Sequence, residues 1–600
     1  MRMKRDFTKN WQIYVMILPV LLYFLVFSYL PMAGIVIAFQ KFSPALGIWK
    51  SPFIGLKNFR DFFGSYYCGR LIGNTLLLST TTLVFAFPCP VILALLLNEV
   101  YNKIYKKAVQ TISYLPYFIS MVVICGLIKN FTASDGFVTQ IVAALGGEKR
   151  NLLADPALFR PIYVVSDIWK NVGFNSIIYL AALSGVNQEL YEAAAIDGAG
   201  RWKQTIHVTL PGIAPTVIIM LILALGGLFN VGFEKVILLY NSMTMETADV
   251  IQICIQEGPY RCQFWLQHGG GAVQFSDQHD SFAHGKQNIQ KSHRNQFVLG
   301  GAAMYRRNVA YRIFSIINYL FLGLLMVVCL LPVVHVLFSS ISDPALLKVH
   351  TGLVAWPLGK PTLKGYEIVL SNSRIARSYM NTLFYVAAST ALGVFLTMMG
   401  GYVLSRKSFL LKKPIMVFIT FTMMFNGGLI PFYLVVKGLG WLDTPFAVIV
   451  PGCLSVFNIV LMRTAMMGIS DSLYESAVLD GAGHFTCFIR IAAPLSKPTI
   501  AAIVLFSAVA QWNSWFQAMI FLKNRKLFPL QLVVREILVE NNTTSVTSGA
   551  DVTSGALSQN LYKYLVQYST VIVTILPIIC IYPFLQKYFV NGIMVGSLKE

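Results

Sequence analysis

The chain has 600 residues, of which 56% are hydrophobic and 12% are charged, and its formal net charge is +21. Ordinary soluble domains carry about 25% charged residues, and the apolar residues here gather into runs of roughly 18 or more, so the composition excludes a soluble chain and predicts an integral membrane protein. The excess of Lys and Arg is typical of cytoplasmic loops, and no basic face alternates with stacking aromatic residues, so we expect no nucleic acid partner.

The apolar runs predict an all-α membrane fold. The basic start MRMKRDFTK precedes a run that is too long for the core of a signal peptide, so we expect a retained first helix with its N-terminus in the cytoplasm. The predicted spans of the first half are 11–39, 74–98, 108–128, 161–184 and 213–232. Those of the second half are 313–339, 380–404, 414–437, 445–467, 499–522 and 565–590.

The distribution of positive charge is consistent within each half but not across their junction. Five crossings leave the chain outside after residue 232, whereas the basic stretch MYRRNVAYR (304–312) is expected inside. The sixth helix of the first half is therefore missing. We divide the chain into a first domain (1–252), a junction (253–303) and a second domain (304–600).

The junction differs from the rest of the chain, because it is rich in His and Gln and has neither helical nor strand periodicity. One interpretation is a flexible linker, and we expect it to be disordered. A metal site built from His268, His279, His284 and His293 is not expected, because their spacing matches no standard ligand pattern. A third hypothesis is that a frameshift joins two adjacent genes. Leu299-Gly300-Gly301, just before Met304, can be encoded by a sequence that resembles a ribosome-binding site.

One short polar loop occurs twice. YEAAAIDGAG at 191–200 reappears as YESAVLDGAG at 474–483, and an offset of 283 aligns both loops and the prolines that follow them. The first residues of each loop favour a helix, which we expect to end at Gly198 and Gly481, since glycine accepts positive φ there. A second short helix should follow and end at Pro211 and Pro494.

These loops resemble the EAA coupling motif of ABC-importer permeases, and the match looks closest to the sugar and polysaccharide permeases of the maltose-transporter type. The resemblance implies two tandem permease domains whose loops each dock into an ATP-binding subunit. It assigns this role to Glu192, Ala193, Asp197, Gly198, Ala199 and Pro211 in the first copy, and to Glu475, Ala477, Asp480, Gly481, Ala482 and Pro494 in the second. Ser476 replaces the usual second Ala.

Catalytic chemistry is not expected on this chain. No phosphate-binding loop of the type GxxxxGK[ST] occurs, so ATP would be hydrolysed by partner subunits, and we expect no bound cofactor, no metal and no enzyme activity. Polar residues inside membrane helices are candidates for the substrate path. They are Gln511, Trp512, Asn513 and Trp515, which alternatively serve core packing, and Asp167 and Lys170, which could instead pair on one helix face.

The resemblance also implies partners and a location. They are a dimer of ABC ATPases, an extracellular lipid-anchored solute-binding protein, membrane lipid and a sugar substrate, in the cell membrane of a bacterium. Two alternatives stay open. One is an ion-coupled secondary transporter with parallel repeats, which predicts carboxylates at the membrane midplane. The other is a non-functional fusion of two adjacent permease genes.

Overall fold

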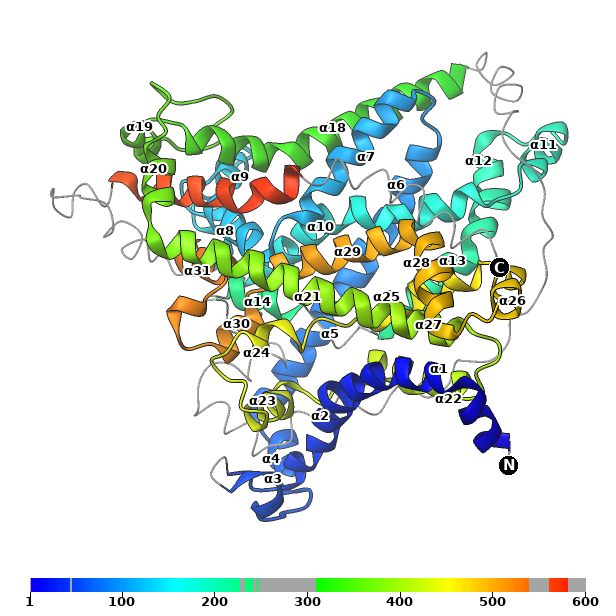
Figure 1. The fold of residues 1–600 in the computed structure, drawn as a ribbon. Coiled ribbons are helices and arrows are strands. Elements are labelled where there is room, and N and C mark those ends of the chain that lie inside the picture. Colours follow the sequence, from blue (N-terminus) through cyan, green and yellow to red (C-terminus); the bar gives the residue numbers. More distant parts are fainter. Residues whose placement is uncertain are drawn as a thin grey trace.

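The computed structural model describes residues 2–43, 46–226, 232–240, 244, 247, 309–538 and 561–580, and this part of the chain is built from helices (Figure 1). Within it, β-type pairing is limited to an isolated antiparallel bridge between Gln40 and Phe53. The predicted all-α membrane fold is confirmed. The junction 253–303 and its four histidines lie outside the described residues, so the domain limits, the frameshift and the disorder of the junction stay predictions.

Seven helical stretches in the described residues are long and apolar enough to cross a membrane. Two further helix pairs, bent by 117° and 82°, bring the number of candidate spans to nine. The seven are Asn10–Phe39, Tyr66–Asn98, Met121–Ala144, Arg201–Gly226, Arg312–Ser340, Ser373–Ser405 and Leu561–Cys580, and the bent pairs are Lys412–Met424 with Leu429–Gly438 and His484–Leu495 with Lys497–Trp512.

The first half begins with α1 (Arg2–Phe24), which continues through a π-helical turn (Leu25–Tyr29), α2 (Leu30–Ala33) and a 3-10 turn (Gly34–Phe39). Its other α-helices are α3 (Gly47–Lys50), α4 (Lys57–Phe63), α5 (Tyr66–Ala86), α6 (Pro88–Asn98), α7 (Lys103–Phe118), α8 (Met121–Thr132), α9 (Phe137–Ala144), α10 (Pro156–Ser184), α11 (Gln188–Ile196), α12 (Arg201–Gln204), α13 (Leu210–Gly226) and α14 (Phe233–Leu239). A 3-10 turn (Leu152–Ala154) precedes α10, and the π-helical turn η4 (Thr205–Thr209) joins α12 to α13.

The second half begins with α18 (Val309–Ser340) and ends, among the described residues, with the helix Leu561–Cys580. Between them lie α19 (Pro344–Val349), α20 (Lys364–Ser371), α21 (Ser373–Ser405), α22 (Lys412–Met424), α23 (Leu429–Gly438), α24 (Phe446–Ile449), α25 (Val456–Met467), α26 (Asp471–Leu479), α27 (His484–Cys487), α28 (Ala493–Leu495), α29 (Lys497–Trp512), α30 (Phe516–Phe521) and α31 (Leu530–Leu538). The π-helical turn η8 (Phe488–Ala492) joins α27 to α28, and a 3-10 turn (Arg525–Leu527) precedes α31.

Some predicted spans are interrupted, and local chemistry explains where. The span expected at 108–128 is divided, because α7 ends at Phe118 after Pro116 and the Ser120 hydroxyl then accepts a hydrogen bond from the Val123 amide as the N-cap of α8. The span expected at 445–467 is likewise divided into α24 and α25 around Pro451.

The first helix of the first half packs on the second half. Figure 1 shows α1 running beside α21, α22 and α25. Ile13, Met16 and Val20 of α1 are fully buried in a core formed otherwise by the second half. The Tyr23 hydroxyl donates a hydrogen bond of 2.6 Å to the Pro451 carbonyl. This contact ties the start of one half to the interior of the other.

The first helix of the second half makes the reciprocal contact, because α18 lies along α7 and α6 of the first half. The Asn318 side-chain amide donates to the Leu96 carbonyl at 3.1 Å, and the Tyr105 hydroxyl donates to the Tyr319 carbonyl at 2.6 Å. Both hydrogen bonds pair polar groups that the lipid bilayer itself could not satisfy. Each half therefore covers a surface of the other.

Two glycines set the closest helix contacts. An added Cβ at Gly173 of α10 would lie 2.0 Å from the Ser113 carbonyl oxygen, and one at Gly393 of α21 would lie 2.0 Å from the Cys453 carbonyl oxygen. Backbone atoms cannot rotate away as a side chain can. Small residues of this kind allow membrane helices to approach each other.

We therefore expect Gly173→Ala and Gly393→Ala each to cost about 1–3 kcal/mol of folding free energy through overpacking. The measurement is the midpoint of thermal unfolding of the purified full chain in detergent. Gly73→Ala is the control, because its Cβ meets nothing within 4 Å. Equal midpoints for all three variants would contradict the packing described here.

Candidate functional site

The repeated loops lie at one end of the helix bundle, near the start of α1. Figure 1 shows α11 and α12 on the same side of the molecule as α26 and α27. We call residues 188–209 the first coupling loop and residues 471–492 the second. Each consists of a helix, a sharp turn, a second short helix and a π-helical turn, and corresponding elements begin and end 283 residues apart.

The turn of the first coupling loop closes through two backbone hydrogen bonds. The Gly198 amide donates to the Ala195 carbonyl at 3.1 Å, and the Ala199 amide donates to the Ala194 carbonyl at 2.8 Å. This is the Schellman pattern, in which a residue of left-handed conformation ends the helix. Gly198 has φ +72°, where a side chain would be strained.

The second coupling loop repeats this arrangement. The Gly481 amide donates to the Val478 carbonyl at 3.0 Å, and the Ala482 amide donates to the Ala477 carbonyl at 2.8 Å. Gly481 has φ +82°. The expected helix ends at both glycines are therefore present, and their backbone geometry is the same although Ala195 is replaced by Val478.

The prolines do not end the second helix as predicted. In the first loop, η4 leads into α13, and Pro211 lies inside a helix that continues to Gly226. The π-helical turn already loosens the backbone hydrogen bonds next to the proline, so its missing N–H and its ring are accommodated. In the second loop the helix bends at Ser496, beyond Pro494 and before Pro498.

The charged residues assigned to the loops point into solvent. Glu192 and Asp197 are exposed, as are Glu475 and Asp480. Among the small residues assigned to docking, Ala193 is exposed, whereas Ala199, Ala477 and Ala482 are partly buried. Ala477 and Ala482 pack against the core of the second half. The roles of these residues stay predictions.

Exposed apolar side chains are a feature of the loops that the sequence interpretation missed. Leu190, Ile196 and Ile206 of the first loop are 53%, 86% and 40% exposed. Their counterparts at the same offset are Leu473, Leu479 and Ile489, which are 48%, 87% and 63% exposed. The offset of 283 could have identified them, since apolar type recurs at these three positions in both loops. These exposed apolar residues are candidates for contact with another protein.

Different groups hold the two loops to the bundle. Beneath the first loop, Arg201 donates to the Tyr101 hydroxyl at 3.4 Å. Burial raises the pKa of the nearby Glu99 carboxyl, and Arg201 and Lys106 oppose this shift. The loop is closed internally by a hydrogen bond from the Tyr191 hydroxyl to Thr209 Oγ1 at 3.0 Å.

Beneath the second loop the buried group is a cation. The Arg406 guanidinium lies 3.7 Å from the ring centroid of Tyr474 and 5.0 Å from that of Tyr402, and Arg406 is 7% exposed. At the surface, Lys407 lies 2.6 Å from Asp471, and this hydrogen bond lowers the pKa of the Asp471 carboxyl and raises the pKa of Lys407. The exposed pair contributes little, because water screens it.

The aromatic and amide candidates for the substrate path are held by protein groups in this conformation. Trp512 is 6% exposed and donates to the Thr574 carbonyl at 3.3 Å, and Trp515 is 1% exposed. Gln511 donates to the Val448 carbonyl, and Asn513 donates to the Phe118 carbonyl across the two halves, both at 3.3 Å. Packing therefore explains these contacts, and sugar contact stays a prediction.

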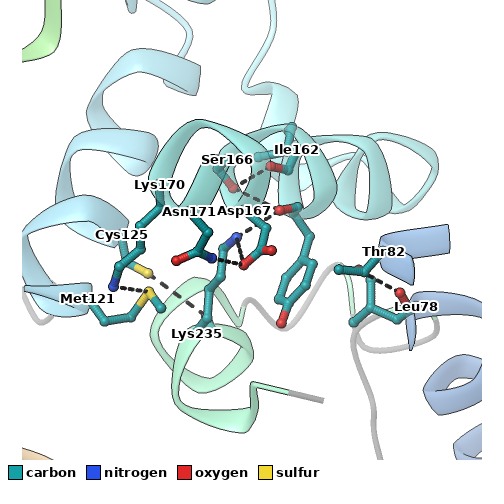
Figure 2. Close-up of polar contacts among 11 residues, drawn as sticks. Leu78, Thr82, Met121, Cys125, Ile162, Ser166, Asp167, Lys170, Asn171 and Lys235 are labelled. Carbon is teal, nitrogen blue, oxygen red and sulfur yellow. Dashed lines mark hydrogen bonds and ion pairs between the residues drawn. The ribbon is translucent and has the colours of Figure 1, made fainter. Parts of the chain in front are cut away.

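Asp167 and Lys170 do not form the pair that their spacing suggested. Figure 2 shows Asp167 facing Lys235 of α14, with 3.8 Å between Oδ1 and Nζ, whereas Lys170 Nζ faces the Met121 sulfur at 4.0 Å. Lys235 is 1% exposed and also donates to the Tyr163 carbonyl at 2.7 Å. Asn171, one turn along α10, also donates a hydrogen bond of 3.0 Å to Asp167 Oδ1. The charged partner of Asp167 is 68 residues away, too far for helical periodicity to reveal it.

The second half has no charge at the corresponding positions. The offset of 283 places Val450 opposite Asp167 and Ala518 opposite Lys235. These residues lie directly after α24 and within α30, which pack against each other. An apolar pair therefore occupies in one half the place that a buried ion pair occupies in the other.

Comparison with known proteins places the repeat in a family. The model of the family described as "binding-protein-dependent transport system inner membrane component" matches residues 75–237 and 389–595. Protein LplB of Bacillus subtilis is 46% identical over 249 residues, which are 41% of this chain and 77% of LplB. The polygalacturonan/rhamnogalacturonan transport system permease protein YtcP of the same organism is 33% identical over 48% of this chain and 99% of its own length.

A crystal structure of a bacterial ABC transporter involved in the import of alginate contains a chain that is 43% identical to this one. The match covers 46% of this chain and 93% of that chain, with a TM-score of 0.42.

The internal comparison allows a test of the ion pair. Asp167→Val leaves the Lys235 charge buried without its carboxylate, and breaking a buried pair in this way costs about 3–5 kcal/mol. Asp167→Val combined with Lys235→Ala copies the residues of the second half, and we expect most of the lost stability to return. The measurement is the thermal midpoint of the full chain in detergent. A double variant no more stable than Asp167→Val would contradict the pairing.

Proposed function

The chain belongs to the binding-protein-dependent inner membrane component family, and from this we propose that it is the membrane-spanning part of an ABC importer for oligo- or polysaccharide. The observation that carries the proposal is the pair of coupling loops. Both present the same exposed Glu, Asp and apolar side chains on the same backbone, at one end of the bundle. A dimer of similar ATPase subunits requires two similar docking surfaces.

In this proposal each coupling loop inserts into one ATP-binding subunit. The rigid Schellman turns transmit displacement rather than absorb it, because each turn is fixed by two backbone hydrogen bonds. Closure of the ATPases pulls both loops and moves the helices between inward-open and outward-open states. The chain itself binds no cofactor and catalyses no reaction, and its partner subunits hydrolyse ATP.

The proposed setting is a bacterial cell membrane, with the N-terminus and both coupling loops in the cytoplasm. An extracellular lipid-anchored solute-binding protein delivers the substrate. The carbohydrate class is supported by the relatives, one of which is named for polygalacturonan and rhamnogalacturonan. Asp167 of α10 is engaged by Lys235, which does not favour a carboxylate free to carry coupling ions.

The test is uptake by proteoliposomes that contain the full chain, an ABC-importer ATPase and a binding protein loaded with labelled oligogalacturonate. We expect uptake to require ATP on the ATPase side and to persist when ionophores collapse the ion gradients. We expect Glu192→Lys and Glu475→Lys each to reduce it about tenfold, which corresponds to about 1.4 kcal/mol of docking free energy.

Two controls separate the alternatives. Lys149→Glu reverses an exposed charge outside both loops and should leave uptake unchanged. Uptake that follows an ion gradient without ATP would replace this proposal with secondary transport. A full chain that never associates with an ATPase would favour the non-functional fusion.

A further inference from the structure

The second coupling loop is in contact with the amino-terminal helix of the first half. His484 Nε2 lies 3.4 Å from Asn10 Oδ1, and the Phe485 amide donates a hydrogen bond of 3.2 Å to Gln12 Oε1. The rings of Trp11 and Phe485 pack edge to face with their centroids 6.4 Å apart. Three consecutive residues of α1 thus meet the first turn of α27.

The backbone of α1 changes direction at this contact. Asn10 has φ −116° and ψ 25°, outside the helical region, and it is 4% exposed. The helix continues from there into the core of the second half, where Tyr23 and Tyr29 donate hydrogen bonds to the carbonyls of Pro451 and Phe418. The kink therefore lies where α1 leaves that core and reaches the coupling loop.

The Gln12 contact supplies a missing helix cap. The first amides of an α-helix lack partners within the helix, and a side chain at the N-cap usually accepts from one of them. The N-cap of α27 is Gly483, which has no side chain to accept. Gln12 Oε1 accepts a hydrogen bond from the amide of Phe485, the second residue of α27, and so acts as the cap. The two residues are 473 positions apart in the sequence.

The space around the two equivalent glycines, Gly483 and Gly200, also differs between the loops. An added Cβ at Gly483 would lie 2.8 Å from the Gln12 side-chain amide, whereas one at Gly200 of the first loop meets nothing within 4 Å. Both glycines have φ and ψ that any residue adopts. Conformation therefore does not require glycine at 483, and an added Cβ there would displace the Gln12 side chain.

The aromatic residues two positions after these glycines differ in exposure. Trp202 of the first loop is 77% exposed, whereas its counterpart Phe485 is partly buried beneath Trp11. One loop therefore presents its own aromatic ring, and the other is covered by the start of α1. The two loops have the same backbone but are supported differently.

We propose that Gln12 is a positioning residue for the second coupling loop, which it caps from the other half of the chain. This inference rests on the proposed function of the loops. α1 leads through α2 to the 3-10 turn Gly34–Phe39, which packs on α4, and α4 packs on α5. A displacement of the second loop is therefore passed to the first half as well as to the second. ATPase closure at this one loop therefore moves both halves.

The first experiment is hydrogen exchange of the full chain in lipid nanodiscs. Gln12→Ala should speed exchange of the amides of residues 484–488 about fivefold, the effect expected for loss of a helix cap. Gln12→Glu keeps a side-chain oxygen at a helix N-terminus and should restore slow exchange. Gly483→Ala should speed exchange at 484–488 more than Gly200→Ala speeds exchange at 201–205. Both changes weaken an N-cap, but only the Cβ at 483 also displaces Gln12.

The second experiment measures coupling in the reconstituted complex with an ABC-importer ATPase and a loaded binding protein. Gln12→Ala should lower substrate-stimulated ATP hydrolysis about fivefold while the ATPase stays bound, and Gln12→Glu should restore it. Unchanged exchange at 484–488 would overturn the cap, and faster exchange with normal coupling would overturn the positioning role. If the wild-type complex shows no stimulation, the proposed function fails, while the exchange result still decides the contact.

Discussion

The burial of α1 in the second half is the constraint on which the rest of the structure depends. Ile13, Met16 and Val20 are fully buried there, and α18 returns the contact to the first half through Asn318 and Tyr319. In a membrane, apolar burial alone does not drive helices together, so close packing and interhelical hydrogen bonds decide their partners. The exchange makes the two halves one assembly, in which contacts between the halves help to position the coupling loops.

The two loops have the same backbone conformation at their turns, but the residues that support them differ. Gly198 and Gly481 share a backbone conformation because their hydrogen bonds are local to each loop. The supports beneath the loops differ, with a partly buried carboxyl at Glu99 and a buried guanidinium at Arg406. Two domains of common architecture thus share the surface that faces outward and differ in the interior that holds it, since packing tolerates compensated substitution.

The sequence predicted the helical fold, the doubled loop and its glycine turns, because periodicity and turn chemistry are local. It could not predict the charged partner of Asp167, since Lys235 approaches through tertiary packing. Nor did it show that the helix of the first loop continues past Pro211, where a π-helical turn accommodates the ring. The cap that Gln12 provides to α27 joins residues 473 apart and has no sequence signal. Helix type and turn chemistry were therefore predictable. Side-chain pairings were not, either between elements or, as Asp167 and Lys170 show, within one helical turn.

The central claim is that both loops contact ATPase subunits, and site-specific photo-cross-linking tests it most directly. A benzophenone amino acid would replace Ile196 or Leu479, which are 86% and 87% exposed at the loop surfaces. After irradiation of bacterial membranes, we expect an adduct with an ABC ATPase from each position. None is expected from Trp49, which is 94% exposed on α3 at the opposite end of the bundle. Adducts from neither loop, or an ATPase adduct from Trp49, would contradict the account.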